Sequence, residues 1–200
     1  MIRVISGEFG GRKLKTPNGC FTRPTADRVR EALFNILGPL DSVTTVWDLC
    51  AGSGALGVEA LSRGAKRAVF VDHDPRACRT LNQNLHALGV TSRATVIQAS
   101  LERFLSSLRH TVQPAELIFS DPPYASGELE RLLAWFALPS CNVPGPGGRV
   151  VLETDVRQAA KLCEWTAKTA LACVDSRRYG DTTLLFLARN PQTSVAQDPS

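Results

Sequence analysis

The sequence predicts an α/β fold in which helices cover both faces of a mostly parallel sheet. From residue 45 onward, short apolar runs alternate with helical stretches. Each run is nearly continuously apolar, which is typical of a strand buried on both faces of a parallel sheet. Repeated strand–helix units with right-handed crossovers give a doubly wound sandwich. The runs are TVWDL (45–49), AVFVD (68–72), ATVIQ (94–98), LIFSD (117–121) and RVVLE (149–153).

Length and composition support a single soluble domain. The chain has 200 residues and 21.6 kDa, with 44% hydrophobic and 21% charged residues. This composition excludes collagen-like, coiled-coil and wholly disordered proteins. The longest uncharged stretch, 132–148, is interrupted by prolines and glycines and cannot span a membrane. The first residues contain no apolar signal-peptide core. We therefore expect a cytoplasmic protein without membrane association.

The cysteines and histidines do not indicate a metal site. They are scattered, with no C-x-x-C pair and no metal-ligand spacing. Free thiols in a reducing compartment are the simplest interpretation, and we predict no metal cofactor. The cysteines are Cys20, Cys50, Cys78, Cys141, Cys163 and Cys173.

The residues before the first strand predict a small N-terminal extension. Residues 1–15 alternate weakly around glycines, which suggests a short hairpin. Thr25 is suited to cap a helix that runs to about Leu37. Apolar residues at 29, 33, 34 and 37 fall on one face of that helix.

The clearest helix lies between the second and third strands. Asp74 suits its N-cap, Pro75 its first position and Gly89 its end. Apolar residues at 78, 81, 85 and 88 form a stripe that we expect to face the core.

The chain closes with a helix and two strands. The helix begins near Val156, and the strands span 171–179 and 182–188, with a turn at Gly180 and Asp181 between them. The tail at 190–200 is polar and without pattern, so we predict that it is disordered.

Basic charge is concentrated at the N-terminus. Residues 1–30 hold seven basic side chains against two acidic ones, whereas the remainder holds 16 against 17. Such asymmetry is typical of a surface that faces a polyanion, although a solvated face would have the same charge. The basic residues are Arg3, Arg12, Lys13, Lys15, Arg23, Arg28 and Arg30.

A glycine-rich turn follows the first predicted strand. Gly52 and Gly54 allow a sharp turn and a close approach to a ligand. The pattern G-x-G-x-x-G at 52–57 is the dinucleotide fingerprint, but a single match is weak. Asp48 precedes it and would repel a pyrophosphate. A carboxylate there suits a cationic group instead, such as the amino group of a methionine moiety.

Two further strand ends carry candidate cofactor contacts, because ligands of open α/β sheets bind at the carboxyl ends of the strands. Asp72 ends the second strand and can accept both hydroxyls of a ribose, in a dinucleotide or an adenosyl cofactor. Its alternative role is a helix cap, which is more plausible for Asp74. Near Ser100 and Leu101, after the third strand, a backbone N–H could meet an adenine ring.

The fourth strand ends in the most informative segment, Ser-Asp-Pro-Pro-Tyr at 120–124. Pro122 and Pro123 hold a stiff extended backbone. This fixes the Pro122 carbonyl beside the Asp121 carboxylate, so that two acceptors face one amino group. Holding the hydrogens of a nucleobase amino group brings its lone pair out of the ring plane toward an electrophilic methyl group. Tyr124 adds a flat face on which a base can stack.

These segments resemble the cofactor, ribose and amino-methylation motifs of class I methyltransferases. More narrowly, the chain resembles the RsmD-type methyltransferases, which modify a guanine N2 in small-subunit ribosomal RNA. The resemblance runs from about residue 2 to 188. It is carried by RVISGEFGGRKL (3–14), RPTADRVREALFNIL (23–37), DLCAGSGALGVEALSRGA (48–65), DPPY (121–124) and RRYGDTTL (177–184).

The resemblance implies a Rossmann-like sheet of seven strands, mostly parallel with an antiparallel last strand. It implies a basic, RNA-facing hairpin and helix at 1–40, an S-adenosylmethionine-dependent methyltransferase domain at 41–189 and the tail beyond. The implied reaction is methyl transfer to a guanine N2 of 16S ribosomal RNA, within an assembled or partly assembled small subunit. Nothing in the sequence demands more than a monomer.

The resemblance also assigns roles to individual residues. Asp48, Gly52 and Gly54 would shape the methionine end of the cofactor site, and Asp72 would hold the ribose. Asp121 and the Pro122 carbonyl would orient the guanine N2, with Asp121 accepting the departing proton. Where the family commonly has Asn or Asp after the third strand, this chain has Ser100. The basic N-terminal residues would bind phosphates.

Three alternatives remain open at the level of sequence. The DPPY motif is shared with methyltransferases that act on DNA adenine N6 or protein glutamine. The glycine pattern also permits an NAD-dependent oxidoreductase. A non-catalytic RNA-binding module with a decayed site is a third interpretation, which the intact DPPY motif disfavours.

Overall fold

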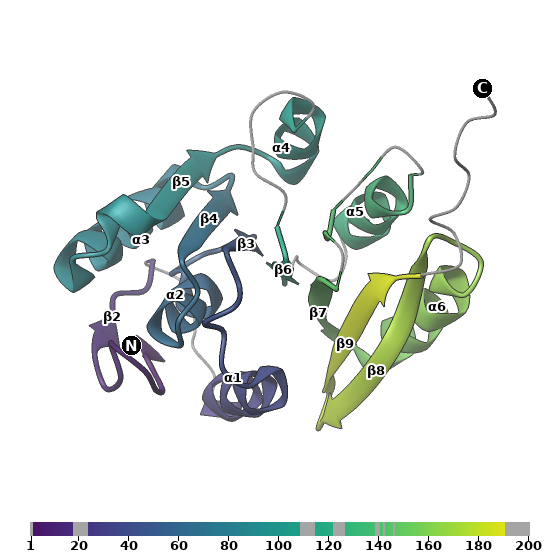
Figure 1. The fold of residues 1–200 in the computed structure, drawn as a ribbon, viewed down its shortest axis with the longest axis horizontal. Helices are drawn as coiled ribbons and strands as arrows, with labels where there is room; N and C mark the ends of the chain where they lie inside the picture. The colour runs from purple at the N-terminus through teal and green to yellow at the C-terminus, as the bar shows by residue number, and fades with distance from the viewer. Residues whose placement is uncertain are drawn as a thin grey trace.

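The computed structural model describes residues 2–17, 24–108, 115–121, 127–138, 141, 143–145 and 147–190, with backbone alone at 24–26 and 128. A seven-stranded sheet forms its centre, with helices on both faces (Figure 1). The strands of this sheet are β3 (Thr45–Leu49), β4 (Arg67–Asp72), β5 (Ala94–Gln98), β6 (Leu117–Ser120), β7 (Arg149–Asp155), β8 (Leu171–Tyr179) and β9 (Thr182–Arg189). The helices are α1 (Pro24–Leu37), α2 (Ala55–Ser62), α3 (Pro75–Leu88), α4 (Leu101–Ser107), α5 (Glu128–Phe136) and α6 (Val156–Thr166), with a short 3₁₀ turn at Thr91–Arg93.

The strand order β5-β4-β3-β6-β7-β9-β8 confirms the predicted fold class. The first five strands in this order are parallel, and β9 is antiparallel to both of its neighbours. The chain builds outward from β3 to β5 and then returns to the other side of β3 with β6. A doubly wound sheet binds its ligand at such a reversal, beyond the carboxyl ends of the strands.

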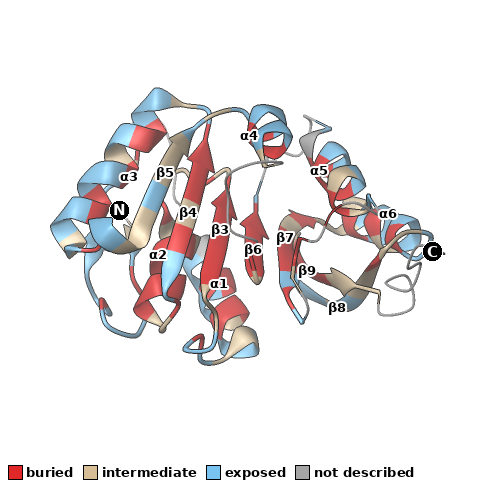
Figure 2. Cartoon of the chain, turned by 45° about the horizontal axis from the view of Figure 1, so that its top comes forward, coloured by how far each residue is buried: buried red, intermediate tan, exposed pale blue. Residues whose placement is uncertain are grey.

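Two hydrophobic clusters lie on opposite faces of the sheet, because successive side chains of a strand point to opposite faces. Val46 belongs to the cluster formed with α1, α2 and α3, whereas Trp47 belongs to the cluster formed with α4, α5 and α6. Figure 2 shows the central strands β3 and β6 buried along their length.

Most predicted elements are confirmed, with two corrections. The strand at 94–98 is not buried on both faces, because β5 is the edge of the sheet and its residues are intermediate or exposed. Thr25 does not precede the first helix, since α1 already begins at Pro24. The helix at 75–88 has Asp74 as its N-cap and Gly89 as its C-cap, as predicted.

The N-terminal hairpin consists of β1 (Ile2–Arg3) and β2 (Lys13–Leu14). Its apolar residues and those of α1 belong to the same core cluster as β3 and α2. The buried Glu59 of α2 accepts the backbone N–H of Ile5 at 2.7 Å and of Ser6 at 3.1 Å. The extension is therefore packed onto the sheet domain through a shared core and hydrogen bonds to a buried carboxylate.

Three further sequence predictions concern the C-terminal tail, the cysteines and membrane spans. The tail at 191–200 and Cys20 lie outside the described residues. Of the described cysteines, Cys78, Cys141, Cys163 and Cys173 are free thiols. No described helix is long and apolar enough to cross a membrane.

Candidate functional site

A pocket opens at the carboxyl ends of β3, β6 and β7, where the strand order reverses. The turn after β3 forms one wall, and α1 with the N-terminal extension forms another. Of the residues singled out from the sequence, the pocket brings together Asp48, Gly52, Asp121 and Arg30. It also includes Glu153, which the sequence analysis missed.

The glycines of the turn after β3 have distinct physical roles. Gly52 has a φ of +57°, and a Cβ built on it would meet no atom within 4 Å, so the space beside it is open to a ligand. Gly54 has a φ of +80° and forms the N-cap of α2, and a Cβ there would lie 2.3 Å from Leu81. At Gly57 a Cβ would lie 2.3 Å from the Phe70 ring. Only Gly52 therefore leaves room for a ligand, while the others permit close packing.

Asp48 is a buried carboxyl group that lines the pocket. It accepts the Gly57 N–H at 2.8 Å, from the first turn of α2. Burial raises the pKa of Asp48 to about 7, against the lowering effect of this hydrogen bond. Among the described residues it forms no ion pair with Lys or Arg. A cationic group in the pocket would stabilise its ionised form.

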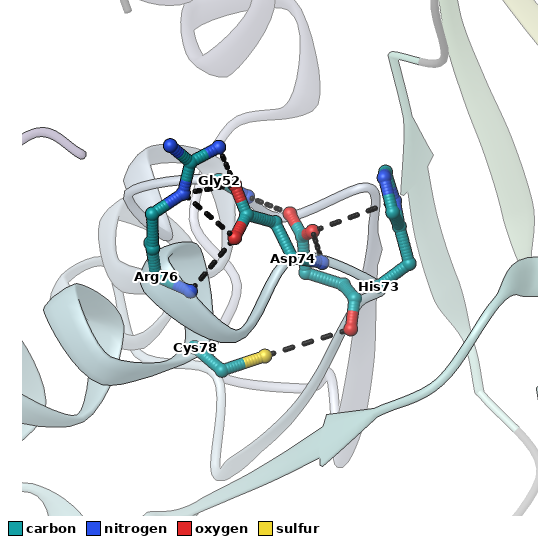
Figure 3. Close-up of polar contacts among 6 residues, drawn as sticks. Gly52, His73, Asp74, Arg76 and Cys78 are labelled. Atoms are coloured by element: carbon teal, nitrogen blue, oxygen red, sulfur yellow. Dashed lines mark hydrogen bonds and ion pairs between the residues drawn. The ribbon is translucent and has the colours of Figure 1, made fainter. Parts of the chain in front are cut away.

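Asp72 connects the end of β4 to the glycine turn. One carboxylate oxygen accepts the Gly52 N–H at 2.8 Å, and the other accepts the Asp74 N–H at 2.8 Å (Figure 3). Asp74, not Asp72, caps α3, because its side chain accepts the Arg76 N–H at 2.8 Å. The helix-cap alternative therefore applies to Asp74, and Asp72 is left to position the turn around Gly52.

Ser100 and Leu101 lie apart from the acid-lined pocket. Ser100 is the N-cap of α4, and its hydroxyl accepts the Arg103 N–H at 3.3 Å. Together with Arg131 and Trp135, Ser100 and the buried Leu101 line a second depression between α4 and α5. The capping bond explains Ser100 without a ligand, so its adenine contact stays a prediction.

Asp121 and Glu153 extend the same face of the sheet as Asp48. Each follows by two residues a core residue of the α1–α3 side, namely Phe119 for Asp121 and Val151 for Glu153. Desolvation by the surrounding protein raises the pKa of Asp121 to about 6, although the residue is exposed to solvent. Burial and then the charge of Asp121 raise the pKa of Glu153 to about 7. Pro122, Pro123 and Tyr124 lie outside the described residues.

The predicted phosphate-binding residues fall into different environments. Arg3, Arg12, Lys13, Lys15 and Arg28 are exposed, and Arg23 lies outside the described residues.

Arg30 is different, because it is buried at 6% exposure. Its guanidinium donates to the Arg3 carbonyl at 2.6 Å and pairs with Asp27 at 3.1 Å. It lines the pocket, so its position suits the pocket wall better than an outer phosphate surface.

Basic residues of α3 extend the N-terminal charge. Lys15 shares a shallow surface depression with Arg76 and Arg79, and Arg12 donates to the Ala87 carbonyl at 2.8 Å. The sequence analysis missed this surface, since α3 was interpreted only by its apolar stripe. A count of the basic residues on the face opposite that stripe could have found it.

Comparisons with known proteins identify a family and several relatives. The family model described as conserved hypothetical protein 95 matches residues 2–188. YlbH of Bacillus subtilis is 45% identical over 132 residues, which cover 66% of this chain and 72% of that protein. Ribosomal RNA small subunit methyltransferase D of Escherichia coli is 41% identical over 132 residues, covering 66% of this chain and 65% of the relative, just under two thirds of its length.

Solved structures extend the similarity across the whole fold. The Escherichia coli protein yhhF matches with a TM-score of 0.78 and 32% identity, over 94% of this chain and 97% of that one. The ribosomal protein L11 methylase of Lactobacillus delbrueckii has a TM-score of 0.68 at 20% identity, over 90% and 86% of the two chains, which shows a shared fold alone.

Proposed function

This chain belongs to the conserved hypothetical protein 95 family, and we propose that it transfers a methyl group from S-adenosylmethionine to a guanine N2 of 16S ribosomal RNA. The observation that carries the proposal is the acid-lined pocket. Three carboxyl groups, from Asp48, Asp121 and Glu153, share it with the open side of Gly52. Such a pocket favours a cationic cofactor and a substrate that presents amino hydrogens.

The residues present fit S-adenosylmethionine. The space beside Gly52 admits a ligand close to the backbone, and Asp48 is a buried carboxyl group without an ion-pair partner among the described residues. Asp48 would hold the amino group of the methionine moiety, and Asp72 would hold the ribose next to the turn that it already anchors. This cofactor supplies an electrophilic methyl group. A dinucleotide fits less well, because its pyrophosphate would lie near the carboxyl group of Asp48.

In this proposal Asp121 orients and deprotonates the target amino group. Methyl transfer would form an N–C bond as the bond between the methyl group and sulfur breaks, with S-adenosylhomocysteine as the leaving group. The nitrogen would then be positively charged and must lose a proton. With a pKa of about 6, the Asp121 carboxyl group is mostly ionised at pH 7 and can accept that proton. In this proposal the Pro122 carbonyl is the second acceptor and Tyr124 stacks on the base, with Pro123 stiffening the segment. The target base must be unpaired or flipped out of its stack.

The names of the relatives support RNA as the substrate. The Escherichia coli and Haemophilus influenzae relatives are both named ribosomal RNA small subunit methyltransferase D, at 41% and 38% identity. The exposed basic residues of the N-terminal extension, together with Arg76 and Arg79, offer positive charge beside the pocket wall at Thr16. We propose that these residues bind phosphates of a small subunit that is at least partly assembled.

Mass mapping of ribosomal RNA tests the proposal. Small-subunit RNA from cells with and without the gene is digested, and the nucleoside fragments are compared. We expect one N2-methylguanosine to be missing without the gene. Purified protein and labelled S-adenosylmethionine should restore it on subunits from the deletion strain. A complete set of methylguanosines in the deletion strain, with label appearing on DNA or protein, would overturn the assignment.

A further inference from the structure

Glu153 lies beside Asp121 at the carboxyl ends of neighbouring strands. Ser120 of β6 and Leu152 of β7 are partners in the parallel register, so Asp121 and Glu153 are the next residues along the two strands. Neighbouring strands are about 4.8 Å apart, and paired residues project to the same face. Both residues line the pocket, and the charge of Asp121 acts on Glu153. The two carboxyl groups are therefore side by side.

The fold itself does not explain this second carboxyl group. Glu153 is half-buried, and among the described residues it accepts no hydrogen bond and forms no ion pair. A half-buried carboxyl group without a partner costs free energy when it is ionised, and two adjacent carboxyl groups repel each other when both are ionised. The proposed function assigns Asp48 and Asp72 to the cofactor and gives Glu153 no role. Glu153 is therefore available to contact the substrate.

A guanine base offers one hydrogen-bond donor to each of these two carboxyl groups. Its Watson–Crick edge presents two neighbouring donors, the N1–H and the N2 amino group, whereas adenine presents an amino group next to an N1 acceptor. Two adjacent carboxyl groups that act as acceptors therefore match guanine, whereas adenine would bring its N1 acceptor against one of them. A site built to accept a substrate hydrogen rejects analogues without it far more strongly than an apolar pocket can.

We propose that Glu153 is a specificity-determining residue that accepts the N1–H of the target guanine, while Asp121 accepts a hydrogen of its N2. This inference rests on the proposed function and deepens it, because it assigns the choice of guanine to one residue of β7.

The test uses small-subunit RNA that carries either guanosine or 2-aminopurine riboside at the mapped position, reconstituted into subunits. The analogue keeps the amino group at C2 but has no hydrogen on N1. For the wild type, kcat/KM should fall about tenfold to a hundredfold on the analogue, as expected for a lost charge-assisted hydrogen bond. Glu153→Ala should lose a similar factor on guanosine and almost nothing more on the analogue, so that its preference ratio approaches one.

Two controls separate this role from a structural one. Titration with S-adenosylhomocysteine should give the same affinity for Glu153→Ala and wild type within about twofold. Asp155→Asn removes the other carboxylate of β7 while keeping a capping side chain for α6, and should leave the preference ratio unchanged. An equal guanosine preference in Glu153→Ala and wild type would overturn this inference alone. No transfer by the wild type to the guanosine subunit would overturn the proposed function, and this inference with it.

Discussion

The side chain of Asn84 forms two hydrogen bonds with the backbone of Lys15, one as acceptor and one as donor. Its Oδ1 accepts the Lys15 N–H at 2.8 Å, and its Nδ2 donates to the Lys15 carbonyl at 2.9 Å. The same Nδ2 donates to the carbonyl of Ser53 at 3.0 Å, inside the glycine turn. One buried amide of α3 thus joins the N-terminal extension to the glycine turn after β3.

Asn84→Ala should weaken cofactor binding although Asn84 does not line the pocket. Removing the amide leaves three backbone groups without their partner, which should lower the free energy of unfolding by about 2–4 kcal/mol. The loosened turn should reduce S-adenosylhomocysteine affinity by about tenfold, measured by isothermal titration. Asn82→Ala is the matched control, because Asn82 is exposed on the same helix and, among the described residues, bonds only to the Cys78 carbonyl. Equal cofactor affinity in both variants would show that Asn84 does not affect cofactor binding through the glycine turn.

Asp72→Ala should weaken S-adenosylhomocysteine binding by about tenfold to a hundredfold while the protein stays folded. The carboxylate provides the predicted ribose contacts and also holds the Gly52 N–H, so both contributions are lost together. Asp74→Ala serves as the control in the same titration. It removes the cap of α3 and should cost about 1 kcal/mol of stability with little change in affinity. If Asp72→Ala binds as the wild type does, Asp72 is not part of the cofactor site.

The sheet could be predicted from sequence because its strands are short, apolar and separated by capped helices. The helix at Pro75–Leu88 is the clearest case, since Asp74, Pro75 and Gly89 each act locally. The edge position of β5 could not be predicted in the same way. Its residues are as apolar in sequence as those of an inner strand, and their exposure follows from strand order alone.

The residues that line the pocket could be predicted from sequence only where they belong to a recognisable motif. Asp48 and Asp121 stand in recognisable patterns, whereas Glu153 ends an apolar run with no pattern of its own. Its place beside Asp121 depends on the register between β6 and β7, which pairs Ser120 with Leu152. The burial of Arg30 likewise depends on how α1 packs against the hairpin, so composition alone placed it with the surface charges.

Asp121→Asn should abolish methyl transfer and spare cofactor binding. Asparagine keeps the size of the side chain but cannot take the departing proton, and its amide can present a donor toward the target amino group. We expect turnover to fall by about a hundredfold or more with saturating substrate. S-adenosylhomocysteine affinity should stay within about twofold of wild type. Retention of more than a tenth of the wild-type turnover would contradict the orienting role of Asp121.

Glu153→Gln should stabilise the ligand-free protein at alkaline pH. The folded-state pKa of Glu153 is raised from 4.5 to about 7, so the folded protein holds this proton more tightly than the unfolded chain. The protonated Glu153 side chain therefore favours the folded state below pH 4.5. This contribution to stability is lost as the pH rises through 7. Glutamine cannot ionise, so the variant should be more stable at pH 8, on the order of 2 kcal/mol, with little difference near pH 4.5. Thermal unfolding at several pH values measures this, and a difference that does not grow with pH would contradict it.

Neutralising Arg12, Lys13 and Lys15 together should weaken RNA binding and flatten its salt dependence. Each lost phosphate contact should reduce the slope of log affinity against log salt by about 0.7–0.9. Cofactor affinity should not change, because Lys15 is tied to Asn84 through its backbone and not through its charged group. Neutralising Arg177 and Arg178 gives a matched comparison, since both are exposed on β8, at the far edge of the sheet. Filter binding at several ionic strengths decides between them. If only the β8 pair changes the slope, RNA binds that edge and the N-terminal charge is a solvated face.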